Sequence, residues 1–299
     1  MKMNPSIGKP RFTDRALWRL VINPLLFCLV FIFVQVSVSI SCRLFFAIQF
    51  GDKPDLIQGM ESVYCPIIYS ALLIVIFSFY LHARHQRRGI ETSLERLSVR
   101  GYIFVFFAAF TAVAVSGLFM LAMQKMAEHI TFVSDKMAEY QELMSQFTMT
   151  KQHSVVGLVF SLAVMVPICE ELLFRGIIME EWLRFTRPSV AILMQALIFS
   201  VMHMNFVQSA YVLLIGVMIG IIYYYTRSLA ASILLHMIFN FVGGVIPSVL
   251  PVKEINMESL GTPEIVQMCT TFFSWLSIPI FLFMFFKYRK KKHLLIKTA

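Results

Sequence analysis

Charged residues are scarce in this sequence. Asp, Glu, Lys and Arg make up 14% of its 299 residues, whereas soluble globular domains average about 25%. Hydrophobic residues make up 58%, and the mean hydropathy is +0.75. This balance excludes a soluble domain and predicts an all-α polytopic membrane protein.

Cysteine patterns that mark disulfides or zinc sites are also missing. The five cysteines include no CxxC pair and show no disulfide-type spacing. The metalloprotease motif HExxH does not occur either. Each cysteine lies within or at the end of an apolar run, and we interpret all five as small apolar fillers: Cys28, Cys42, Cys65, Cys169 and Cys269.

Long apolar runs, in contrast, are abundant. A helix that crosses a bilayer needs about 20 consecutive apolar residues, and eight stretches meet this requirement. They lie at about 20–48, 62–82, 101–123, 154–179, 188–206, 208–226, 228–247 and 267–286. The first is too long for a signal-peptide core and is expected to be a retained helix. The pattern predicts one bundle of about eight transmembrane helices that forms a single domain over residues 1–299.

Basic residues predict the orientation of this bundle. Most of the 26 Lys and Arg residues lie before the first run, between the second and third, after the fourth and sixth, or after the last. Examples from these five segments are Arg19, Arg84, Arg184, Arg227 and Lys287. By the positive-inside rule these segments are cytoplasmic, so both termini are expected in the cytoplasm.

The net charge of +9 is explained by this topology and by anionic lipid head groups. We therefore expect the lipid bilayer, and no nucleic acid, as a partner. The predicted location is the cell membrane, and the short loops favour a bacterial plasma membrane.

Two further patterns concern packing. Residues 124–150 alternate apolar and charged side chains at helical spacing, which predicts an amphipathic helix on the membrane surface or an extension of the third span. Interfacial packing is the favoured role, and admission of substrate is the alternative.

Gly216 and Gly220 have the small-xxx-small spacing that lets membrane helices approach closely, but this motif is common and says little about activity.

Two glutamates and an arginine interrupt the fourth run. A charged residue at the bilayer centre costs roughly 2.5–3.5 kcal/mol on insertion scales, so such residues usually face a bundle interior or a wet cavity. Glu171 and Arg175 are four residues apart, share a helix face and can neutralise each other. Glu170 points about 100° away, which leaves its carboxylate available as a general base or acid.

Polar partners for this pair lie on the fifth and seventh runs. Phe199 and His203 share one face of the fifth, and His236 and Asn240 share one face of the seventh. Each histidine alone would be interpreted as hydrogen-bonded to a neighbouring helix. However, at about 1.5 Å per residue, Glu170, His203 and Asn240 all lie roughly 20–24 Å from the nearest cytoplasmic basic residue. A shared buried polar site explains this common depth.

These residues resemble the three motifs of the CPBP family. Glu-Glu-x-x-x-Arg at 170–175, Phe-x-x-x-His at 199–203 and His-x-x-x-Asn at 236–240 occur in the family's order on successive apolar runs. That family comprises the CaaX-processing intramembrane endopeptidases and their bacterial bacteriocin-processing or self-immunity relatives. The resemblance implies that residues 150–250 form the motif-bearing catalytic core.

The resemblance also implies an activity, namely that of a glutamate-dependent intramembrane endopeptidase with no cofactor and no obligatory metal. In this family Glu170 would activate water, His203 would help to hold that water, and His236 and Asn240 would donate hydrogen bonds to the oxyanion. Glu171 and Arg175 would support the geometry of Glu170. The expected substrate is a membrane-associated peptide or protein.

Three alternatives remain open from the sequence. Glu170 with the two histidines is also a plausible zinc ligand set, although HExxH is absent. A non-proteolytic membrane regulator or self-immunity protein could carry the same motifs and bind a partner. A transporter with a buried proton relay is the third, and it is disfavoured because the sequence shows no inverted repeat.

Overall fold

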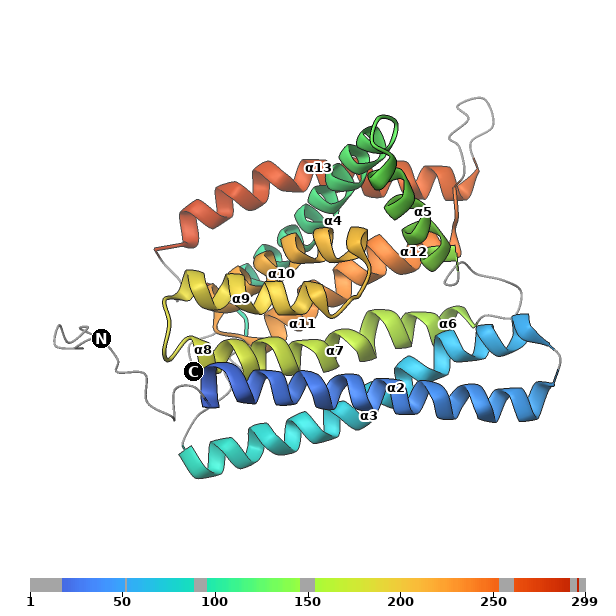
Figure 1. The fold of residues 1–299 in the computed structure, drawn as a ribbon. Coiled ribbons are helices and arrows are strands. Elements are labelled where there is room, and N and C mark those ends of the chain that lie inside the picture. The colour runs from blue at the N-terminus through green and yellow to red at the C-terminus, as the bar shows by residue number, and fades with distance from the viewer. Residues whose placement is uncertain are drawn as a thin grey trace.

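The computed structural model describes residues 18–51, 53–88, 96–145, 154–252, 261–290 and 295, without the side chains of Arg87 and Arg88. The described chain is built from helices (Figure 1). Their bounds are η1 Trp18–Ile22, α2 Asn23–Phe50, α3 Pro54–Arg88, α4 Val99–Ala127, α5 Thr131–Ser145, α6 Val155–Leu158, η2 Val159–Met165, α7 Val166–Glu171, η3 Leu172–Met179, α8 Glu180–Trp182, α9 Pro188–Val201, α10 Phe206–Thr226, α11 Leu229–Asn240, η4 Phe241–Val245, α12 Ile246–Val249 and α13 Thr262–Tyr288.

Seven stretches in the described residues are helical, long and apolar enough to cross a membrane. They are Trp18–Phe50, Pro54–Gln86, Val99–Ala127, Val155–Trp182, Phe206–Thr226, Leu229–Val249 and Thr262–Tyr288. The chain is therefore an all-α, multi-pass membrane protein, as the sequence predicts.

The predicted fifth span, 188–206, is shorter than expected. It forms α9, which has 14 residues. At about 1.5 Å per residue this helix is about 21 Å long, short of the roughly 30 Å hydrocarbon layer. The expectation of about eight full spans is corrected here, because α9 and α10 form a hairpin whose first arm stops early.

The tip of this hairpin comprises Met202 to Asn205. The Asn205 side chain accepts a hydrogen bond from the Gln208 N–H and so caps the start of α10, which favours a break in the helix at this point. Met204 has a positive φ of 54°, an uncommon conformation for a residue with a side chain. Its side chain is 90% exposed, which suits contact with lipid better than contact with water.

Helix α5 covers this tip. Val133 and Met137 of α5 are buried in one cluster with Val207 of α10. The ring of Phe132 meets that of Phe206, with centroids 5.5 Å apart. Thus the amphipathic helix expected within 124–150 exists, but it folds back against α10 and does not extend the third span; Phe147 of the predicted pattern lies outside the described residues.

Basic side chains gather at one end of the bundle, which we call the basic end. It contains Arg19 before α2, Arg84 late in α3, Arg227 after α10 and Lys287 late in α13. The start of α2 and the end of α13 both lie there (Figure 1). This agrees with the predicted common side for the termini, although the terminal basic residues Lys2, Lys9, Arg11, Arg15 and Lys297 lie outside the described residues.

Close packing of α9 on α10 depends on the predicted glycine pair. A Cβ at Gly216 would lie 3.1 Å from the Phe199 ring and 3.2 Å from Cβ of Ala196. A Cβ at Gly220 would lie 2.8 Å from Nε2 of Gln195, which is fully buried. The glycines therefore let the arms of the hairpin touch along their length.

We predict that Gly220→Val destabilises the protein by about 1–3 kcal/mol, because the added atoms must displace Gln195 from a filled interface. Gly117→Val is the matched control, since a Cβ at Gly117 has nothing within 4 Å. Unfolding of the detergent-solubilised variants measures the difference. Equal stability of the two variants would show that this interface is loose.

Candidate active site

The helix that carries both glutamates is continuous from Val155 to Trp182 but is not uniformly α-helical. Two π-helical segments, η2 and η3, lie on either side of the α-helical turn that contains Glu170 and Glu171. π-helical turns are rare in proteins, and those that occur are often found at functional sites. Pro167 contributes to the break after η2, because proline has no N–H for the helical ladder.

This break frees one carbonyl, and Asn240 binds it. The Val166 N–H bonds to Ser161 O, five residues earlier, so it does not serve Leu162 O. The next N–H in a π-helical pattern would come from Pro167, which has none. Instead Nδ2 of Asn240 donates to Leu162 O at 2.9 Å. Asn240 thereby joins the end of α11 to η2.

Glu171 is the centre of the buried polar cluster. Its side chain is fully buried, and its Oε1 accepts hydrogen bonds from Arg175 Nη1 at 2.7 Å and from His236 Nδ1 at 2.8 Å. Its Oε2 has no hydrogen-bond partner among the described residues. A buried carboxylate oxygen of this kind is a place where ordered water is expected.

Arg175, also fully buried, extends this cluster towards the α9–α10 hairpin. Its Nη2 donates to Gly216 O at 3.1 Å, and Gln195 Nε2 donates to the same carbonyl at 2.9 Å. The guanidinium also lies over the Phe199 ring, 5.0 Å from the centroid. The i to i+4 pairing of Glu171 with Arg175 predicted from the sequence is thus observed.

His236 lies between the two carboxylates. Because Glu171 Oε1 accepts its hydrogen bond, Nδ1 of His236 carries a proton. Nε2 on the other side of the ring faces Glu170 Oε2 at 3.6 Å, which is too long for a direct hydrogen bond. Glu170 points away from the Glu171–Arg175 pair, as its position predicts, and its side chain is 13% exposed.

His203 lies after the end of α9, in the hairpin tip, and not on the helix face that the sequence predicts. Its Nδ1 hydrogen-bonds to Phe199 O at 2.9 Å, and because a carbonyl only accepts, this nitrogen is the donor. The His203 ring also packs edge-on to the Phe199 ring. The Phe199 ring also approaches His236, with ring centroids 5.8 Å apart.

The structure therefore brings together four of the six predicted site residues: Glu170, Glu171, Arg175 and His236. His203 packs against the ring of Phe199, which also approaches His236, and Asn240 lies one helical turn beyond His236 with its amide on η2. In the described part of the chain, no three His, Cys, Asp or Glu side chains are grouped as metal ligands.

The sequence analysis missed a second buried charged cluster near the basic end. Glu180 Oε1 accepts a hydrogen bond from the Tyr223 hydroxyl at 2.7 Å and forms an ion pair with Arg227 Nη2 at 3.0 Å. Arg19 Nε lies 3.4 Å from Glu181. The signal was the second Glu-Glu pair, at 180–181, which follows directly after the predicted end of the fourth span.

A buried cluster of two glutamates, an arginine and a histidine, held inside a multi-pass helical bundle, defines a class of membrane protein with a polar site within the bilayer. Residues 152–242 match the family model described as type II CAAX prenyl endopeptidase Rce1-like, and this segment contains all six predicted site residues. The match confirms the resemblance to the CPBP family of CaaX-processing proteases. No curated protein and no solved structure matches the chain.

We predict that Arg175→Met destabilises the protein by about 3–5 kcal/mol, since it removes the guanidinium from a fully buried carboxylate. The double variant Glu171→Gln/Arg175→Met should be less destabilised than Arg175→Met, because the unpaired charge is then gone. Arg289→Met, at an exposed position after α13, is the control and should change stability by no more than about 0.5 kcal/mol.

Equilibrium unfolding in mixed detergent micelles measures all three variants. A double variant that is less stable than Arg175→Met alone would show that the ion pair does not account for the loss.

Proposed function

We propose that this protein is an intramembrane glutamic endopeptidase that hydrolyses peptide bonds of membrane-associated peptides or proteins. The family match supports a protease. The observation that supports a glutamic mechanism is the chain of contacts from Glu170 to His236, from His236 to Glu171 and from Glu171 to Arg175. One carboxylate, Glu171, is held through its Oε1 by Arg175 and His236. The other, Glu170, faces a histidine nitrogen across a gap that leaves its oxygen available.

In the proposed reaction Glu170 acts as the general base. A water molecule beside Glu170 and His236 attacks the carbonyl carbon of the scissile bond, and its proton moves to the Glu170 carboxylate. A C–O bond forms, and the carbonyl oxygen becomes an oxyanion. Glu170 then gives the proton to the amide nitrogen, the C–N bond breaks, and a carboxylic acid and an amine are released.

His236 is proposed to stabilise the oxyanion. Since Nδ1 already donates to Glu171, Nε2 can donate only when the ring is protonated. Nδ2 of Asn240 has a second N–H besides the one used by Leu162 O, and it can serve as another donor.

His203 has a different part in this proposal. Its Nδ1 proton is fixed by Phe199 O, so Nε2 of the neutral ring accepts a hydrogen bond and can orient the attacking water. The Phe199 ring packs edge-on to both histidines and so helps to position them.

A second function is favoured by the same arrangement. Arg175, His236 and Asn240 each form a hydrogen bond to another helix, so the motif residues also have a structural function that needs no catalysis. This supports a non-proteolytic regulator or self-immunity protein, which would use the fold to bind a partner and would not need Glu170 as a base.

The prediction that separates these functions concerns Glu170→Gln. It keeps the shape of the side chain but removes the base, so peptide cleavage should fall by at least about 100-fold, the usual range for loss of general base catalysis. The measurement is mass spectrometry of new peptide termini in membranes of cells that express wild-type protein or the variant. Glu128→Gln, at an exposed surface pair with Lys125, is the matched control and should cleave normally.

Identical sets of new termini in wild-type and Glu170→Gln membranes would contradict the proteolytic mechanism. If Glu170→Gln also restores the phenotype of cells that lack the protein, the partner-binding function is the correct one.

A further inference from the structure

A large cavity lies in the half of the bundle away from the basic end. Its volume is about 680 Å³, within the range of roughly 300–1,000 Å³ that is typical of ligand pockets. Its walls come from the later part of α4, the start of α10, η4 with α12, and the first half of α13. These are the segments that lie opposite the basic end, where α4 ends and α13 begins (Figure 1).

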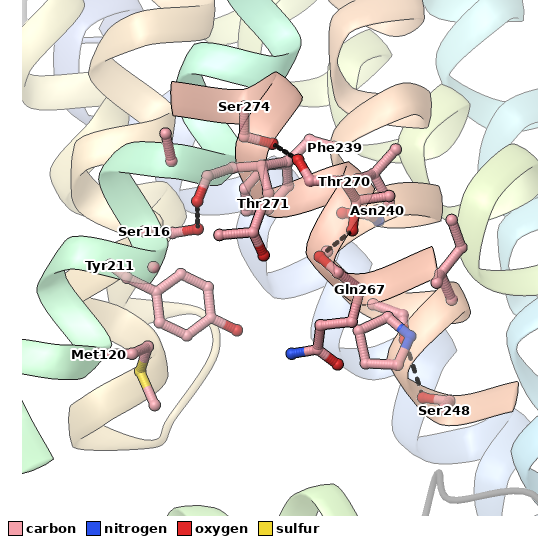
Figure 2. A pocket seen from close by; sticks show the side chains of 18 of the residues that line it. Ser116, Met120, Tyr211, Phe239, Asn240, Ser248, Gln267, Thr270, Thr271 and Ser274 are labelled. Atoms are coloured by element: carbon pink, nitrogen blue, oxygen red, sulfur yellow. Dashed lines mark hydrogen bonds between the residues drawn. The ribbon is translucent and has the colours of Figure 1, made fainter. Parts of the chain in front are cut away.

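The described lining is mostly apolar, and the polar groups within it carry no charge. Among the described residues that form the wall there is no Asp, Glu, Lys, Arg or His. The polar groups are amides and hydroxyls, such as Gln208, Tyr211, Gln267 and Thr271. Figure 2 shows Tyr211 on one wall and Gln267 on another, with their polar ends directed into the space between them.

This chemistry narrows the choice of occupant. A phospholipid head group brings a phosphate, and an ammonium group brings a cation, and neither finds a counter-charge among the described residues of the wall. An extended peptide brings uncharged N–H and C=O groups, which cannot remain unpaired inside a bilayer. Amide and hydroxyl side chains both donate and accept, so they can pair with such a backbone.

One wall of the cavity adjoins the candidate active site. Asn240 and Leu162, which are joined by a hydrogen bond, both line the cavity. Asn240 lies one helical turn from His236 on α11, about 5.4 Å along the helix axis. A chain in the cavity therefore contacts Asn240, which lies on the same helix as His236.

We propose that this cavity holds an uncharged, extended segment of the peptide substrate, which enters from the extracytoplasmic side. The side follows from the positive-inside rule, which places the basic end in the cytoplasm. This inference rests on the proposed endopeptidase function and adds to it a direction of access and a substrate class: membrane peptides whose stretch next to the cleaved bond lacks charge.

The direction of access is tested with thiol labelling in a Cys269→Ser background, because Cys269 is the one exposed cysteine of the five. Thr271→Cys lies in the cavity wall, and Phe272→Cys is the matched control, since Phe272 is the next residue, is 71% exposed and lies outside the lining. A membrane-impermeant maleimide added outside intact cells should label Thr271→Cys and not Phe272→Cys. Labelling of Thr271→Cys only from the cytoplasmic side would overturn the direction.

The occupant is tested by protection of Thr271→Cys in the Glu170→Gln variant, so that no cleavage is needed. The probe is acetyl-Ala-Leu-Ala-Leu-Ala-amide, which should slow labelling. The same peptide with a central Lys should need at least about tenfold higher concentration, because its charge finds no partner in the wall. Protection by phosphatidylglycerol vesicles and not by the neutral peptide would overturn the proposal in favour of a lipid site.

Cleavage separates this inference from the function on which it rests. With Glu170 intact, labelled Thr271→Cys should lose the new peptide termini that unlabelled Thr271→Cys produces. If labelling leaves these termini unchanged while Glu170→Gln removes them, the cavity is not on the substrate path, and only this inference fails. Termini that persist in Glu170→Gln overturn the proposed function and the substrate assignment with it.

Discussion

The shared oxygen of Glu171 is the constraint on which the site depends. One carboxylate oxygen accepts hydrogen bonds from Arg175 on its own helix and from His236 on α11. Arg175 in turn reaches Gly216 of α10, so three helices are fixed to one buried charge. In a bilayer, no water compensates for a partner that is lost, and each of these contacts therefore restrains the others. Glu170 lies beside this network, and its carboxylate remains available.

Backbone irregularity matters as much as charge in this arrangement. The two π-helical segments widen the helix on either side of the glutamates, and Pro167 leaves Leu162 O without a partner in the ladder. Asn240 supplies that partner. Asn240, which the sequence suggests as a catalytic hydrogen-bond donor, thus also satisfies a free backbone carbonyl. Both functions are possible because its amide group has two N–H bonds.

Much of this could be predicted from the sequence, because hydrophobic length and charge carry strong signals in membrane proteins. The apolar runs, the amphipathic segment before residue 150 and the Glu171–Arg175 pair were all visible as spacing. The early end of α9 could not be predicted, because residues 202–206 remain apolar enough to continue a span. The break depends on the cap formed by Asn205. The direction of a side chain could not be predicted either: the motif spacing places His203 near Phe199, but it cannot show that Nδ1 of His203 is bound to the Phe199 carbonyl.

The short α9 also has a consequence for the surrounding lipid. Its outward face is apolar, with Val190, Leu193 and Val201 exposed, and the helix is about 9 Å shorter than the hydrocarbon layer is thick. Acyl chains beside this face must shorten or tilt to avoid a hydrophobic mismatch. We therefore expect local thinning of one leaflet next to the His203 turn. A thin bilayer accommodates the short helix at lower cost than a thick, sterol-rich one.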